Sequence, residues 1–127
     1  MADKKSIRPS IPSAQVKKQM SEEEKFQNAV IRPIIKLQHH LLFLFLKGYF
    51  TKNKIVLPHH SETEAVKNIE TLFAKNKSFR VELRGFVIGL FTEEEYEEYL
   101  PLSSELNKRI HQMIKERVLS QLDFFTT

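Results

Sequence analysis

The sequence predicts an all-α fold, a compact bundle of about five helices, and three observations support it. Ser21, Ser61 and Thr92 are each followed three residues later by glutamate, which is the pattern of a helix-capping box. Only three of the 127 residues are glycine, although sandwiches and barrels need glycine in their turns. Apolar residues recur at spacings of three and four, without a clean alternation of period two. We therefore expect a single helical domain over residues 21–127, preceded by a flexible, disordered basic tail over residues 1–20.

The first helix is expected to span residues 21–50 and to be the longest element of the domain. Apolar residues, among them Ile35, Leu42 and Leu46, cover half of its circumference or more. A face that wide is buried on two sides, either inside the domain or across a dimer. Pro33 lacks a backbone N–H and its ring clashes with the carbonyl four residues earlier, so we expect a kink or a break there.

Four shorter helices are expected to follow. One of them carries glycines at Gly85 and Gly89, four residues apart. Each glycine costs about 1 kcal/mol relative to alanine in a helix interior, so we interpret the pair as a close crossing with another helix. The expected helices begin at polar residues that can cap them: residues 61–76, a helix from Ser78, residues 92–101, and a last helix from Ser103 or Ser104.

The net charge of +4 belongs to the tail. Residues 1–20 carry five basic side chains and one acidic one, so a pI near 9.3 does not by itself imply nucleic-acid binding. Within the domain, six bases and no acid lie between Lys25 and Lys54, and five glutamates and no base lie between Glu93 and Glu98. Opposite blocks of this kind favour pairing, either within the fold or across a dimer.

The main candidate for a binding surface is a basic stripe along the first helix. At 100° per residue its members fall on one side of the helix, around an aromatic ring. Such a stripe can bind nucleic acid through phosphate contacts and base stacking, or it can be a solvated basic face whose ring a neighbour buries. The residues of this basic stripe are Arg32, Lys36, His39, His40, Phe43 and Lys47.

The sequence predicts no catalytic, cofactor-binding or metal-binding residues. It contains no cysteine, no G-x-S-x-G motif and no H-E-x-x-H motif. The histidines form two adjacent pairs and a single His111, and adjacent histidines on a helix diverge by 100°, which prevents chelation by one pair. The longest apolar run, Leu41–Leu46, has six residues, whereas a membrane-spanning helix needs about 20, so no membrane span is expected.

Three segments of the chain resemble a known family. They are F-Q-N-x-x-I-R-P-I-I-K-L-Q at 26–38, F-R-x-x-L-R-G-F-V-I-G-x-F-T-x-E-E-Y at 79–96, and S-S-E-L-N-K-R at 103–109. They are similar to a family of small, uncharacterised bacterial proteins, some of which carry the label "glyoxalase". The resemblance implies a bacterial cytoplasmic protein and brings no functional residues with it. The label implies a metal-dependent lyase, an enzyme class built from β-α-β-β-β modules with histidine and glutamate ligands on strands.

These observations predict a non-catalytic interaction or regulatory protein that self-associates as a homodimer, with no cofactor. The wide apolar face of the first helix, together with Phe124 and Phe125 near the C-terminus, supports self-association. A second hypothesis is a nucleic-acid-associated protein that uses the tail and the Lys25–Lys54 stripe. The third hypothesis is the glyoxalase-type lyase.

Overall fold

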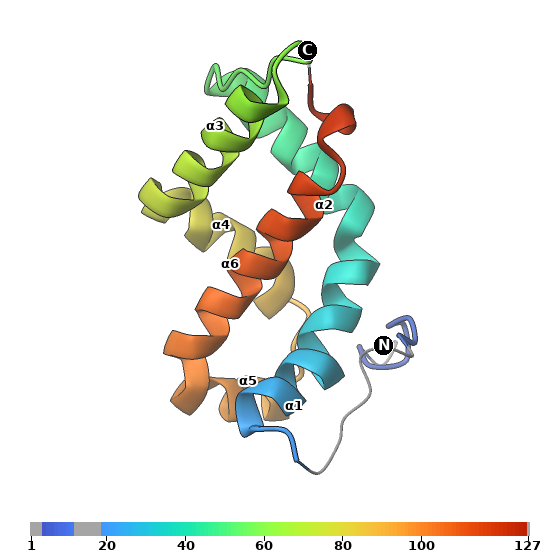
Figure 1. Ribbon diagram of the computed structural model, residues 1–127. Helices are drawn as coiled ribbons and strands as arrows, with labels where there is room; N and C mark the ends of the chain where they lie inside the picture. Colours follow the sequence, from blue (N-terminus) through green and yellow to red (C-terminus); the bar gives the residue numbers. More distant parts are fainter. Residues whose placement is uncertain (1–3, 12–18, 127) are drawn as a thin grey trace.

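Helices make up 75% of the computed structural model (Figure 1), which describes residues 4–11 and 19–126. No strand occurs among these residues, so the predicted all-α fold is confirmed, and the expected number of about five helices is approximately right. The α-helices are α1 Glu22–Phe26, α2 Arg32–Lys52, α3 Glu62–Lys75, α4 Lys77–Ile88, α5 Glu93–Tyr99 and α6 Ser103–Leu119.

Helices α1 and α2 belong to one continuous helix with a π-helical turn, η2 (Gln27–Ile31), between them. In this turn the N–H of Arg32 bonds to the carbonyl of Gln27, five residues earlier. Pro33 follows directly, within the first turn of α2. Because its ring would clash with the carbonyl of Ala29 in an α-helix, the wider turn accommodates the proline without ending the helix. The interruption expected at Pro33 therefore takes the form of a π turn.

The three predicted capping residues begin helices in the structure. Their hydroxyls accept the backbone N–H three residues later, at 3.1 Å for Ser21, 3.2 Å for Ser61 and 3.1 Å for Thr92. At Thr92 the box is complete, because the carboxylate of Glu95 accepts the Thr92 N–H at 2.9 Å. Each such bond satisfies a backbone donor that the helix itself leaves free.

One expected helix start differs from the structure, whereas the last helix begins at Ser103 as expected. Ser78 does not cap α4: Asn76 does, because its Oδ1 accepts the N–H of Phe79 at 3.0 Å. Ser78 lies inside the helix, and its hydroxyl donates to the same Oδ1 at 3.0 Å. Helix α6 begins at Ser103 without a side-chain cap, because the 3₁₀ turn η3 (Leu100–Leu102) leads into it directly.

Helices α2, α3, α4 and α6 pack against one another. Helix α2 packs against α4, and α6 packs against α3 and α4 (Figure 1). The rings of Tyr49 and Phe79 lie 4.8 Å apart at one end of α2, and those of Phe26 and Phe91 lie 5.4 Å apart at the other. Helix α4 therefore runs antiparallel to the long helix, which places the turn between α4 and α5 beside α1.

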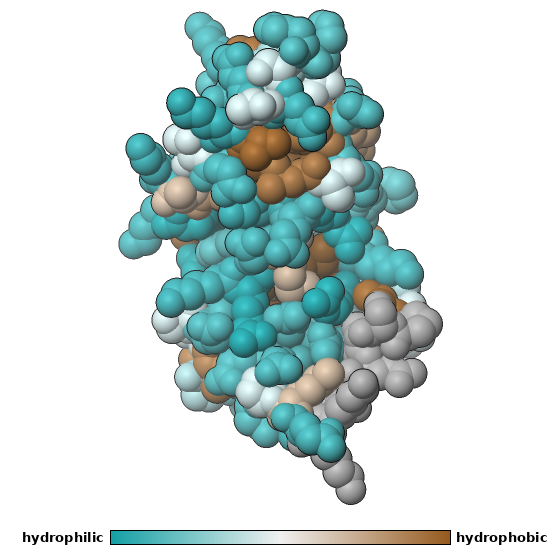
Figure 2. Space-filling view, viewed as in Figure 1, coloured by the Kyte–Doolittle hydropathy of each residue, from teal (hydrophilic) through white to brown (hydrophobic). Residues whose placement is uncertain are grey.

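The long helix Glu22–Lys52 is long and apolar enough, by length and composition, to cross a membrane, and it is the one such helix among the described residues. Core helices of soluble proteins pass the same test. In this helix 39% of the most apolar stretch is buried inside the bundle, and Ile34, Leu42 and Leu46 are completely buried. The face of the molecule turned toward the reader in Figure 2 is mostly hydrophilic, with its main hydrophobic patch in the upper half.

The N-terminal segment 4–11 contacts the domain, within the part of the chain for which the sequence indicated a flexible basic tail. The guanidinium of Arg8 donates to both carboxylate oxygens of Glu95 and to the carbonyl of Leu90, each at 2.7 Å. Lys4 Nζ donates to the carbonyl of Phe91 at 3.0 Å. The cations thus satisfy carbonyls at the end of α4 and the carboxylate at the start of α5. The other parts of the expected tail at 1–3 and 12–18 lie outside the described residues.

Candidate functional site

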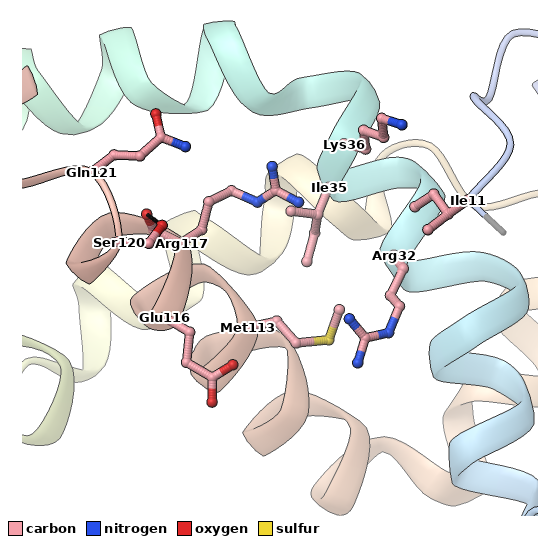
Figure 3. A pocket seen from close by; sticks show the side chains of 9 residues that line it. All are labelled: Ile11, Arg32, Ile35, Lys36, Met113, Glu116, Arg117, Ser120 and Gln121. Atoms are coloured by element: carbon pink, nitrogen blue, oxygen red, sulfur yellow. Dashed lines mark hydrogen bonds between the residues drawn. The ribbon is translucent and has the colours of Figure 1, made fainter. Parts of the chain in front are cut away.

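Part of the basic stripe borders a hollow between α2 and α6 (Figure 3). The hollow has a volume of about 390 Å³, and Arg32 and Lys36 line it from α2. The side chain of Arg117 enters it from α6, on the opposite side from Arg32. Ile35 and Met113 provide apolar surface between these cations. The remaining lining residues are Ile11, Glu116, Ser120 and Gln121.

The two arginines of the hollow are not neutralised by carboxylates. Within residues 4–11 and 19–126, no carboxylate oxygen lies within 4.0 Å of a nitrogen of Arg32 or Arg117. Arg32 Nε donates to Oδ1 of Asn28 at 3.0 Å, and Arg117 Nη1 lies 3.3 Å from Nδ1 of His39. Burial, and then the charge of Arg32, lower the pKa of Arg117. Positive charge therefore exceeds negative charge in the hollow, where Glu116 is the one carboxylate among the lining residues.

Because a guanidinium has only donors, Nδ1 of His39 is the acceptor in its contact with Arg117, which requires an imidazole that carries its proton on Nε2. Burial is the largest cause of the lowered pKa of His39, and the charges of Arg117 and His40 add to it. A neutral imidazole keeps one nitrogen without a proton, and that nitrogen can accept from a guanidinium. His39 thus helps to hold the Arg117 side chain and adds no positive charge to the hollow.

Phe43 does not provide a stacking surface. Its side chain is 3% exposed, because the 3₁₀ turn η4 (Leu122–Phe124) folds the C-terminal segment over it. Its ring lies 4.9 Å from that of Phe125 and 5.6 Å from that of Phe124. Lys47 Nζ lies 4.7 Å above the Phe124 ring, so this charge is also engaged within the fold. The ring of the stripe is therefore buried by a neighbouring segment.

A row of exposed leucines runs along α2 beside the basic residues. Leu37, Leu41 and Leu44 are 36%, 56% and 62% exposed, and their spacing of four and three aligns them on successive turns. We call these three residues the leucine row. Gly48 continues the row one turn later, and a Cβ added there would contact nothing within 4 Å. The wide apolar face of this helix is therefore buried on one side and open on the other.

The two ends of the leucine row carry opposite charge. Beyond its C-terminal end, Lys47 and Lys52 are exposed. At its N-terminal end, Glu98 of α5 shares a hollow with Pro33, one turn before Leu37. The other exposed carboxylates of α5 belong to Glu93, Glu94 and Glu97.

The two glycines of α4 do not face another helix, which corrects the expected close crossing. A Cβ at Gly85 would contact nothing within 4 Å. A Cβ at Gly89 would lie 2.9 Å from the carbonyl oxygen of Gly85 in its own helix, which ends there. The packed side of α4 is formed by Phe79, Leu83 and Val87, and Gly85 lies on the exposed side. The four-residue spacing is therefore not a contact motif within this chain.

The histidines do not assemble into a metal centre in the part of the chain that the structure describes. No group of three or more histidine, aspartate or glutamate side chains there could hold a metal ion. His111 lies apart from the adjacent pairs, and its buried Nε2 has no hydrogen-bond partner among these residues. Burial, followed by the charge of Arg84, lowers the pKa of His111 to about 4.

Sequence reasoning missed Arg117, although a signal was present. On α6, Ile110 and Ile114 are buried and Met113 is half-buried, and Arg117 falls on the same side of the helix. A cation on an otherwise apolar helix face is rarely buried without a partner. That position would have extended the predicted basic stripe from one helix to two.

No protein-family model, no curated protein and no solved structure matches the chain. The resemblance to small bacterial proteins and the cytoplasmic location therefore stay predictions.

Proposed function

We propose that this protein is a non-catalytic interaction module that pairs with a second copy of itself through the leucine row. The exposure of Leu37, Leu41 and Leu44 on helix α2 supports the proposal. Half-exposed leucines contribute about 1 kcal/mol each when a partner covers them, so two rows contribute about 6 kcal/mol before the cost of association. Because association costs about 4 kcal/mol or more, the leucine row alone gives only weak pairing, and micromolar affinity requires further contacts from the charged residues around it.

The charges at the ends of the row favour an antiparallel pair. If two copies of α2 cross antiparallel about a two-fold axis, the exposed Lys52 of one copy faces the α5 carboxylates of the other. Lys4 and Lys5 lie near those carboxylates, but four exposed glutamates on α5 still leave this end acidic. A parallel pair would instead place like charges together, which opposes association.

The mass of the full chain tests the proposal. We expect light scattering between 10 and 500 µM, a range of about two decades around the expected affinity, to show a rise from the 15.0 kDa monomer toward twice that mass. A variant with Leu41→Gln and Leu44→Gln should stay monomeric. Leu100→Gln is the matched control, because Leu100 is 50% exposed on η3 and lies outside the row. A monomer at every concentration, or equal loss in the control, would contradict pairing through the row.

The absence of cysteine from the sequence allows a test of the orientation. We would introduce Lys52→Cys and Glu98→Cys in separate chains and treat them with a bismaleimide cross-linker. In an antiparallel dimer the mixture of the two variants cross-links, whereas each variant alone does not. Cross-linking of Lys52→Cys with itself would show a parallel pair.

A membrane is the alternative occupant of the leucine row. Sedimentation with vesicles of neutral and anionic phospholipid distinguishes it from a second copy. Vesicle binding that the Leu41→Gln and Leu44→Gln variant loses, by a chain that is monomeric in solution, would overturn self-association.

A further inference from the structure

We infer that the hollow between α2 and α6 binds a phosphate monoester, with its phosphate between Arg32 and Arg117 and its organic group against Ile35 and Met113. This inference rests on residues outside the leucine row and is independent of self-association. Arg32 and Arg117 come from different helices and border one hollow. Neither has a carboxylate partner in the described part of the chain.

The charge of the hollow fits a dianion. Arg32, Lys36 and Arg117 supply three positive charges, and Glu116 supplies the one negative charge among the lining residues. Glu116 Oε1 accepts from Gln112 Nε2 at 3.0 Å. The net excess of two positive charges matches a phosphate monoester, which carries nearly two negative charges at pH 7. A phosphodiester or a simple carboxylate, with one charge, would leave the excess only half neutralised.

The donor groups also suit phosphate. A guanidinium presents N–H groups in a planar fork that matches two phosphate oxygens, and two forks from different helices can bind different oxygens of one group. The hydroxyl of Ser120 already donates to the carbonyl of Arg117 at 2.7 Å, so it adds no donor to the hollow. Gln121 is exposed at the edge and can donate through its amide. The arginines therefore carry the recognition.

The apolar part of the hollow limits the organic group. Ile35 is 1% exposed, and Met113 is half-buried beside it. Ile11 of the N-terminal segment adds a third apolar side chain. A volume of about 390 Å³ lies at the lower end of the range for small-molecule sites. The hollow thus suits a phosphate on one compact group, such as a single ring, and is too small for a dinucleotide.

Calorimetric titration of the full chain with phenyl phosphate tests the inference. The ionic strength must be held constant with NaCl, because non-specific binding of anions weakens with salt. We expect saturable binding to the native chain and at least a tenfold loss of affinity in Arg32→Gln and in Arg117→Gln. Lys67→Gln is the matched control, because Lys67 is an exposed cation on α3 that does not line the hollow. Its affinity should stay within twofold of the native value.

Three results would overturn the inference. They are no saturable binding at 20 mM phenyl phosphate (about −2 kcal/mol or weaker), equal weakening in Lys67→Gln, and equal binding of benzoate, which would assign the site to carboxylates. A 12-nucleotide single strand of nucleic acid without terminal phosphates tests whether the hollow binds the phosphodiesters of a polymer. Tighter binding of that strand, lost in the same arginine variants, would assign the hollow to phosphodiesters. Arg32 is exposed, so Arg32→Gln keeps the test valid even where Arg117→Gln fails to fold.

Discussion

The ion pair between Arg8 and Glu95 should contribute strongly to stability, although the sequence indicates a flexible basic tail over residues 1–20. Their side chains are only 6% and 5% exposed. Arg8→Ala would remove both charge-assisted bonds to Glu95 and the bond to the Leu90 carbonyl. Glu95 would then keep the hydrogen bond from the N–H of Thr92, at 2.9 Å, and the nearby charge of Lys5. A buried carboxylate with one remaining hydrogen bond is strongly destabilising.

The magnitude follows from the burial of the pair. Removal of one partner from a buried ion pair costs about 3–5 kcal/mol. Arg8 belongs to a terminal segment, so water can reach Glu95 after truncation, and we expect a loss of about 2–3 kcal/mol. That corresponds to a fall in Tm of about 10 °C for a domain of this size. Arg8→Ala/Glu95→Gln should be less destabilised than the sum of the single variants predicts, because they share one interaction.

Thermal and urea unfolding of the four chains of this double-mutant cycle measure the coupling free energy. Lys4→Ala is the control, because Lys4 is exposed and donates only to the Phe91 carbonyl, so its loss should cost less than 0.5 kcal/mol. A loss below 0.5 kcal/mol in Arg8→Ala as well would refute the docked segment.

The ion pair should also affect how the free energy of unfolding changes with pH under acidic conditions. Burial raises the pKa of Glu95, but the hydrogen bonds from Arg8 and from the Thr92 backbone, with the charge of Arg8, outweigh burial and lower the pKa overall. A lowered carboxyl pKa contributes stability above the unfolded value of about 4.5, and this stability is lost as the pH falls through the folded pKa. The difference between native chain and Arg8→Ala should therefore shrink below pH 4.5.

Two further predictions concern single positions. Gly85→Ala should raise the free energy of unfolding of the monomer by about 0.4–1 kcal/mol, because the added methyl meets open space and the unfolded chain loses entropy. A lower Tm would show that Gly85 makes a close contact. His111, with its pKa lowered from 6.5 to about 4, binds its proton in the unfolded chain first, so stability should fall as the pH drops from 6.5 toward 4. Because His111 is only half-buried, we expect this drop in pH to lower the free energy of unfolding by about 1–2 kcal/mol. The variant His111→Leu should lose this pH dependence. If its stability depends on pH as in the native chain, His111 is not the titrating group.

Local chemistry made most of the fold predictable from the sequence. Ser21, Ser61 and Thr92 begin helices because a side-chain oxygen placed before three free N–H groups acts within one turn of chain. Pro33 likewise marks an interruption whose cause is local. The incorrect expectation that Ser78 caps a helix also has a local cause, because Asn76, two residues earlier, offers the better-placed acceptor.

The candidate site was less predictable because it depends on which helix covers which face. Periodicity showed that α2 is apolar over half of its surface or more, but it could not show that Leu42 and Leu46 are buried while Leu41 stays exposed. Burial of Phe43 depends on the C-terminal turn, far along the chain. Arg117 joins Arg32 only after α6 has packed into place. Each of these features depends on tertiary packing, which the sequence pattern of a single helix does not predict.

The N-terminal segment connects the ion pair to the α2–α6 hollow, which yields a final prediction. Arg8 is fixed against Glu95, and Ile11, three residues later, lines the hollow near Lys36 and Arg32. Arg8→Ala should release Ile11 and weaken phenyl phosphate a few-fold, since one apolar contact is worth about 1 kcal/mol. Inorganic phosphate has no organic group, so its affinity should not change. Equal weakening of both ligands would mean that Arg8 acts through the arginines of the hollow and not through Ile11.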